Sequence, residues 1–68
     1  MADVVKVIQI IGSSNESFAK AADAAVQEAS KTVRGITGVD VVSMSAMVEG
    51  DHISEYRTTV NIAFAIER

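Results

Sequence analysis

Arg57, Thr59 and Asn61 are the side chains of this sequence with the clearest capacity for binding chemistry. They alternate along the segment 56–66, and alternate residues of an extended strand share one face. The other face of this segment carries the β-branched and aromatic residues that are typical of a buried surface. The guanidinium of Arg57 offers a planar fork of N–H donors that fits a carboxylate, a phosphate or an imide-like edge. An inter-subunit salt bridge to a neighbour's glutamate explains this arginine equally well, so both interpretations stay open.

Catalytic residue sets are not visible in the sequence. The chain has no cysteine, a single histidine (His52) and no serine with a recognisable base, so nucleophilic catalysis has no basis. The segment Gly12-Ser13-Ser14 lacks the lysine and the spacing of a phosphate-binding loop. We therefore predict that the protein is not an enzyme.

Carboxylates could form an ion site only in combination. Glu16, Asp40 and Glu49 are candidate ligands for calcium or magnesium if the symmetry of an assembly brings copies together. Glu16 has a competing role, because Ser13 and Glu16 have the spacing of a helix capping box. The acidic residues near position 50 do not match the spacing of a calcium-binding loop, and we expect them to form a solvated acidic end.

The first elements that position these residues are a strand and a helix. Residues 4–11 are rich in β-branched side chains and are followed by Gly12, which predicts a first strand. A helix is expected from about Asn15 to Arg34. Its apolar residues recur at steps of three and four and would form one core-facing stripe, consisting of Phe18, Ala22, Ala25, Val26, Ala29 and Val33.

Both expected ends of this helix carry capping signals. Ser13 and Glu16 would close the first turn as a capping box, and Ser14 is an alternative N-cap. Lys31 falls in the expected last turn, where a cation favours the negative end of the helix, and Gly35 would supply the stop.

A long hairpin follows the helix. Residues 35–38 are expected to form a loop, and a second strand starts at Val39. Beyond Asp40 this strand alternates, with Val42, Met44, Ala46 and Val48 on one face. A tight turn centred on Gly50-Asp51 connects it to the last strand, so the two strands should pair antiparallel. The order strand, helix, strand, strand predicts a single α+β domain over residues 1–68, with one helix on one face of a three-stranded antiparallel sheet.

Composition predicts self-association. A 68-residue domain has little private core, and this one lacks the cysteines for disulfides and the ligands for a zinc site. Yet 49% of its residues are hydrophobic and its mean hydropathy is +0.26, which indicates apolar surface that a partner covers. The net charge of −3 and the absence of a basic cluster argue against nucleic acid as a partner. No apolar run reaches the length of a membrane span and no signal-peptide pattern is present, so we expect a soluble, cytoplasmic protein.

Nearly the whole chain resembles the dodecin family. The resemblance lies in the segments 7–14, 16–18, 21–26 and 56–64, together with Ala29, Thr32-Val33 and Val41-Val42. It implies a subunit whose long hairpin wraps around the helix, and a hollow homododecamer with 23 symmetry. Flavin-binding members hold pairs of flavins, such as riboflavin or FMN, or related aromatic molecules between subunits. They store and buffer these ligands without turnover. Some members bind coenzyme A, and others have been described as calcium-binding.

Two positions depart from the flavin-binding pattern. Gly38 stands where those members carry the tryptophan that stacks on the flavin ring, and Arg57 stands where they carry a glutamine that hydrogen-bonds the ring edge. Losing one stacked aromatic partner forfeits on the order of 1 kcal/mol beyond buried area. The residues that match the family's pocket, which would form its remnant here, are Thr37, Gly38, Met44, Arg57 and Thr59.

The sequence thus predicts a dodecin-like, non-enzymatic shell that binds small ligands or ions and lacks the usual tight flavin binding. One alternative is a flavin storage and buffering protein with an altered pocket. The other is a calcium-binding dodecin.

Overall fold

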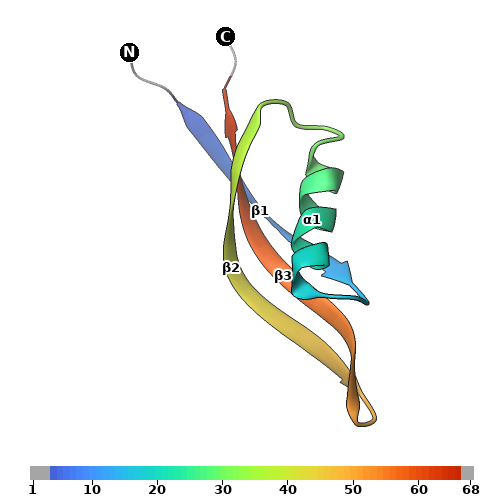
Figure 1. Ribbon diagram of the computed structural model, residues 1–68. Helices are drawn as coiled ribbons and strands as arrows, with labels where there is room; N and C mark the ends of the chain where they lie inside the picture. Colours follow the sequence, from blue (N-terminus) through green and yellow to red (C-terminus); the bar gives the residue numbers. More distant parts are fainter. Residues whose placement is uncertain (1–3, 67–68) are drawn as a thin grey trace.

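The chain forms four elements in the predicted order. They are β1 (Val5–Ser14), α1 (Phe18–Ala29), β2 (Ile36–Glu49) and β3 (His52–Ala65). The computed structural model describes residues 4–66. Its strands form one antiparallel sheet in the order β1-β3-β2, and α1 lies on one face of that sheet (Figure 1). The predicted α+β fold and the antiparallel hairpin are confirmed. Among the described residues, no helix is both long and apolar enough to cross a membrane.

The central strand β3 has the two unlike faces that its sequence predicts. Thr58, Val60 and Ile62 are buried under the helix. The Thr58 hydroxyl donates a hydrogen bond to the carbonyl oxygen of Phe18 over 2.9 Å. The rings of Phe18 and Tyr56 pack edge to face with their centroids 4.9 Å apart. The apolar face of β3 is therefore the surface on which the helix rests.

Small residues let the helix approach the sheet closely. Ala21, Ala25 and Ala29 are its buried positions. A Cβ atom added at Gly12 would overlap the carbonyl oxygen of Ala21 and would lie 3.0 Å from the Cβ of Ala25. The prediction that the first strand stops at Gly12 is wrong, because this glycine pairs with Thr58 inside the ladder and makes room for the helix.

The helix starts later than predicted. Ser17 is its N-cap, and the Ser17 hydroxyl accepts a hydrogen bond from the backbone N–H of Lys20 over 3.0 Å. The Ser14 hydroxyl accepts from the backbone N–H of Glu16 over 2.9 Å, in the turn before the helix. Neither the Ser13–Glu16 capping box nor the Ser14 cap is formed, because a serine nearer the first helical residue satisfies the free N–H.

The helix also ends earlier than predicted, at Ala29. The hydroxyls of Ser30 and Thr32 donate to the backbone carbonyl oxygens of Gln27 and Ala29, over 2.8 and 3.5 Å. Hydroxyl residues compete with helical hydrogen bonding in this way, so they end the helix before Lys31 and Gly35. The expected run to residue 34 is therefore wrong at its last turn, and Val33 lies outside the helix.

Strand β2 begins at Ile36, three residues before the predicted start at Val39. The reason is pairing, since Ile36 faces Phe64 in the ladder and the carbonyl of Gly35 accepts from the N–H of Ala65 over 3.0 Å. The register then shifts between Val41 and Ser43. This bulge puts Val41 on the helix side together with Met44, although simple alternation would place them on opposite faces. The predicted turn is confirmed, with Gly50 at a φ of 67° as its first central residue.

The helix covers β1 and β3 and leaves β2 largely uncovered. The result is visible in Figure 1, where the β2–β3 hairpin extends well past the start of α1. Val39, Val41 and Met44 share the helix side of β2, and Val41 and Met44 are 53% and 59% exposed. An apolar strip of this kind is typical of a surface that another chain covers.

We expect Gly12→Ala to destabilise the subunit by about 1–3 kcal/mol, the usual cost of overfilling a packed interior. The added methyl group must displace the Ala21 backbone, which cannot rotate out of the way. Urea unfolding followed by circular dichroism measures the change. Gly38→Ala is the matched control, because a Cβ at Gly38 meets nothing within 4 Å. Equal unfolding midpoints for the two variants would contradict the close packing of α1 against Gly12.

Candidate functional site

The face of the sheet opposite the helix, called the outer face below, carries the polar side chains predicted to bind. Direct cross-strand partners share a face, so the register defines rows across it, three of which contain Asn61, Thr59 and Arg57. These rows are Gln9–Asn61–Asp40, Ile11–Thr59–Ser43 and Ser13–Arg57–Ser45. In the first row, the side-chain amide of Gln9 donates to the amide oxygen of Asn61 over 3.1 Å. The predicted alignment of Arg57, Thr59 and Asn61 therefore continues onto both neighbouring strands.

Arg57 has an ion-pair partner within its own strand. Its Nε donates to Oε2 of Glu55 over 3.0 Å, and the two side chains are 46% and 39% exposed. Neither predicted interpretation included this pair, although residues two apart on a strand share a face and sequence spacing alone indicates it. At this exposure an ion pair contributes roughly 0–1 kcal/mol to stability. The pair therefore orients the guanidinium more than it stabilises the fold.

The remnant pocket predicted from the resemblance is divided between two faces in one subunit. Gly38 pairs with Ala63 and lies on the outer face, together with Arg57 and Thr59. Met44 pairs with the buried Thr58 and so lies on the helix side. The Thr37 hydroxyl donates to the backbone carbonyl of Ala63 over 3.4 Å. One subunit does not bring the five residues together, so a common pocket requires a neighbouring chain.

All three aromatic side chains lie on the helix side of the sheet. Phe18 and Tyr56 contact each other there, and Phe64 pairs with Lys6 and Ile36 on the same face as Ile62. The space beside Gly38 is open. Within residues 4–66, the outer face of a subunit therefore offers hydrogen bonds and one cation, Arg57, but no ring on which a flat ligand can stack.

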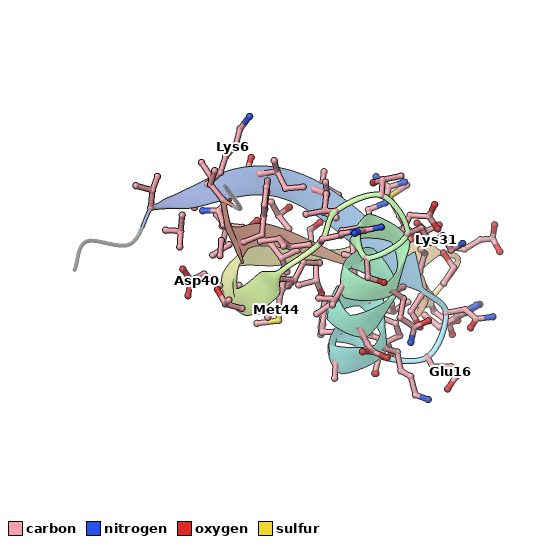
Figure 2. The ribbon with its side chains drawn as sticks, turned by 90° about the horizontal axis from the view of Figure 1, so that it is seen from above. Lys6, Glu16, Lys31, Asp40 and Met44 are labelled. Atoms are coloured by element: carbon pink, nitrogen blue, oxygen red, sulfur yellow. The ribbon has the colours of Figure 1, made fainter. Side chains whose placement is uncertain are left out.

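The predicted metal ligands lie in three separate places. Glu16 is in the β1–α1 connection, Asp40 pairs with Asn61 on the outer face, and Glu49 is at the end of β2. Figure 2 shows Glu16 and Asp40 on opposite sides of the view. Across residues 4–66, no three His, Asp or Glu side chains gather closely enough to hold a metal ion. Shared sites between subunits stay a prediction.

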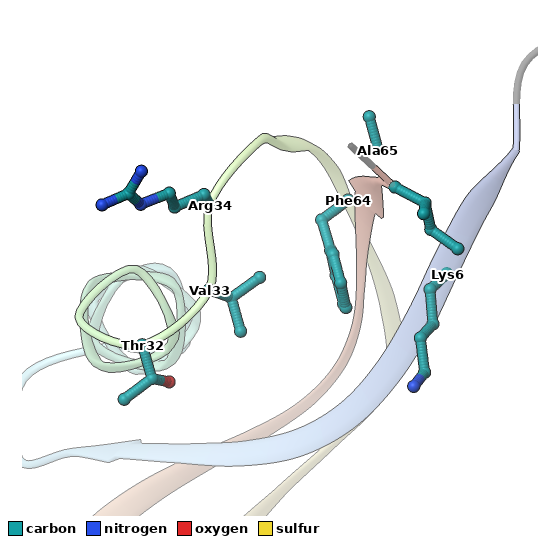
Figure 3. A pocket seen from close by; sticks show the side chains of 7 residues that line it. Lys6, Thr32, Val33, Arg34, Phe64 and Ala65 are labelled. Carbon is teal, nitrogen blue, oxygen red and sulfur yellow. The ribbon is translucent and has the colours of Figure 1, made fainter. Parts of the chain in front are cut away.

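A hollow of about 400 Å³ opens where the chain leaves the helix, and sequence reasoning missed it. Its lining comes from β1, from the α1–β2 connection and from the end of β3, and consists of Lys6, Thr32, Val33, Arg34, Phe64, Ala65 and Ile66. Figure 3 shows Val33 and Phe64 facing each other across it, whereas the Arg34 side chain points away. A prediction that ended the helix at Ala29 would have indicated this hollow, because residues 32–34 then lie outside the helix and can line it.

We expect Arg57→Gln to leave folding and the size of the particle unchanged. The Arg57–Glu55 pair is solvent-exposed, so its loss should cost no more than about 1 kcal/mol. Urea unfolding and native mass spectrometry of both proteins measure this. A smaller particle for Arg57→Gln would show instead that Arg57 forms the inter-subunit salt bridge.

Comparisons with known proteins agree with this architecture. A family model described as Dodecin matches residues 4–67. No curated protein matches the chain. The fold is similar to that of dodecin from Streptomyces davaonensis, with a TM-score of 0.95, 20% identity and full coverage of both chains. It is also similar to Thermus thermophilus dodecin in which tryptophan is replaced by phenylalanine, with a TM-score of 0.94, 25% identity and coverage of 98% of this chain and 100% of that one. A T. thermophilus variant with arginine replaced by alanine gives a TM-score of 0.94 at 27% identity, with 98% of each chain covered. The β-α-β-β chain described here belongs to the dodecin family.

Proposed function

We propose that this dodecin forms a homododecameric shell with 23 symmetry that sequesters a small ligand or ion between its subunits without catalysing a reaction. We further propose that it does not hold flavin in the stacked arrangement of the flavin-binding members. The observation that carries the second part is an outer face without an aromatic ring, with open space at Gly38.

The exposed apolar surface of one subunit supports the shell. Large hydrophobic side chains are exposed on both edge strands, among them Val5, Val7 and Ile11 on β1 and Val41 and Met44 on β2. Within residues 4–66, the buried apolar core consists of three alanines, Val60 and Ile62. A core of this size is marginal, so a surface this apolar is best explained by burial against further copies.

The chemistry of the outer face supports the loss of flavin stacking. Riboflavin and FMN present a flat ring whose main contribution to binding would come from contact with another flat surface. A glycine supplies none. The ring's imide edge needs both a donor and an acceptor opposite it, and the guanidinium of Arg57 can only donate. Both departures, at Gly38 and at Arg57, therefore weaken the binding of flavin.

We expect native mass spectrometry of the purified protein to give a particle of twelve 7.2-kDa subunits. Val41→Glu should shift the protein to smaller species, because it places a charge in the uncovered apolar strip of β2. Ala24→Glu adds the same charge at an exposed position of the helix and is the control. A wild-type monomer or dimer at micromolar concentration would contradict the shell.

We expect riboflavin and FMN to show no stoichiometric fluorescence quenching when titrated with the wild-type protein at submicromolar flavin. The double variant Gly38→Trp with Arg57→Gln should bind flavin roughly tenfold tighter or more than the wild type, since each stacked ring contributes on the order of 1 kcal/mol beyond buried area. A Cβ atom at Gly38 meets no other atom of the subunit within 4 Å, so a side chain at this position starts in open space.

Gly38→Leu with Arg57→Gln is the matched control, because it adds apolar volume without a ring. Stoichiometric quenching by the wild type would reject the proposed loss of flavin binding. Equal flavin affinity of the leucine and tryptophan variants would show that stacking at this position is not the missing contribution.

A further inference from the structure

We propose that Arg57, with Ser13 and Ser45 on either side, forms a binding site for the carboxylate or phosphate group of a small organic anion. This inference rests on the proposed function, because the site occupies the outer face that would line the remnant pocket. It goes further by naming the chemical class of the ligand and the donors that recognise it.

The ladder register places two hydroxyl groups beside the guanidinium. Arg57 pairs with Ser13 of β1 on one side and with Ser45 of β2 on the other. Directly paired residues on neighbouring strands have their Cβ atoms about 4.5–5.5 Å apart. Both serines are exposed, as is Arg57. A cation with a hydroxyl donor on each side, all open to one face, suits an oxyanion that accepts several hydrogen bonds.

Glu55 leaves the two terminal nitrogens of the Arg57 guanidinium available to a ligand. The carboxylate of Glu55 accepts only from Nε, over 3.0 Å. Within residues 4–66 the two terminal nitrogens of Arg57 have no hydrogen-bond partner. Those nitrogens form the parallel pair of donors that a carboxylate or phosphate engages with two oxygens. Glu55 therefore acts as a positioning residue, because it holds the plane of the fork.

Exposed apolar side chains flank the Ser13–Arg57–Ser45 row, which indicates that the anion carries an apolar group. On the same face, Ile11 lies two residues before Ser13 on β1 and is 66% exposed. Met47 pairs with Glu55 at the other side of the row and is also exposed. An apolar group attached to the oxyanion can rest against either side chain. An uncharged ligand gains less, since the guanidinium has no acceptor to offer it.

The test is isothermal titration calorimetry of the assembled protein with 1-naphthyl phosphate, 1-naphthoate and 1-naphthol. The three probes share one ring system and differ in the oxyanion. We expect at least one of the two anions to bind roughly tenfold tighter than the uncharged naphthol, the usual strength of a hydrogen bond to a charged group. Comparison of the two anions shows whether the site favours phosphate or carboxylate. A general attraction of anions cannot produce this preference, since the net charge of each chain is −3.

Arg57→Gln should abolish the preference, and Ser45→Ala should reduce it several-fold. Lys31→Gln is the matched control, because it also removes one positive charge from an exposed ion pair, that of Lys31 with Glu28. Glu55→Gln keeps an acceptor for Nε and removes a negative charge near the bound anion, so the anion should bind roughly threefold tighter. Glu28→Gln, the corresponding control, should leave binding unchanged.

Equal affinity for naphthol and both anions in the wild type would overturn the proposal, as would a preference that survives in Arg57→Gln. Failure of the proposed function is read separately. It appears as a small particle in the native mass spectrum or as tight flavin quenching, and neither result depends on the naphthyl probes.

Discussion

The structure depends on how closely α1 can approach the sheet. Gly12 on β1 faces the backbone of Ala21, and no side chain larger than a hydrogen atom fits between them. The same closeness is possible along the helix because its buried positions are alanines. The consequence is a thin core in which Val60 and Ile62 are the large buried apolar side chains. A subunit built in this way gains precise packing but little hydrophobic stabilisation of its own, which makes association part of its stability.

The position of the helix also determines which surfaces remain for function. Because α1 covers β1 and β3, the helix side of β2 stays apolar and exposed, while the outer face carries polar rows through Asn61, Thr59 and Arg57 next to exposed apolar residues of β1. The two uncovered surfaces differ in chemistry. The apolar strip with Val41 and Met44 suits contact between copies, and the rows through Thr59 and Arg57 suit a ligand. Packing of one helix thus leaves an uncovered apolar strip on β2 and uncovered polar rows on the outer face.

The sequence predicts this fold where the pattern is periodic and fails where single contacts decide. Alternation along β3 identified both of its faces, because one face of the strand is fully buried. The helix ends were wrong because serine hydroxyls at positions 17 and 30 make local hydrogen bonds that helical periodicity does not contain. The bulge after Val41 has no signal in composition. In the site, the outer-face row and the Glu55–Arg57 pair follow from alternation along β3, whereas the pairing of Met44 with the buried Thr58 depends on the register after the bulge.

Gly38 and Arg57 are best understood as one change in how a ligand is held. A tryptophan at position 38 would place its ring on the outer face beside Ala63, six residues along β3 from Arg57, so the ring and the guanidinium would meet only across neighbouring subunits. A glutamine at position 57 without that ring would leave a flat ligand hydrogen-bonded at one edge and unsupported on its faces. Removing the ring and introducing the charge together gives a consistent surface. In the proposed site, such a surface would hold a ligand by its charged end through directed donors, without the stacking that a flavin would need.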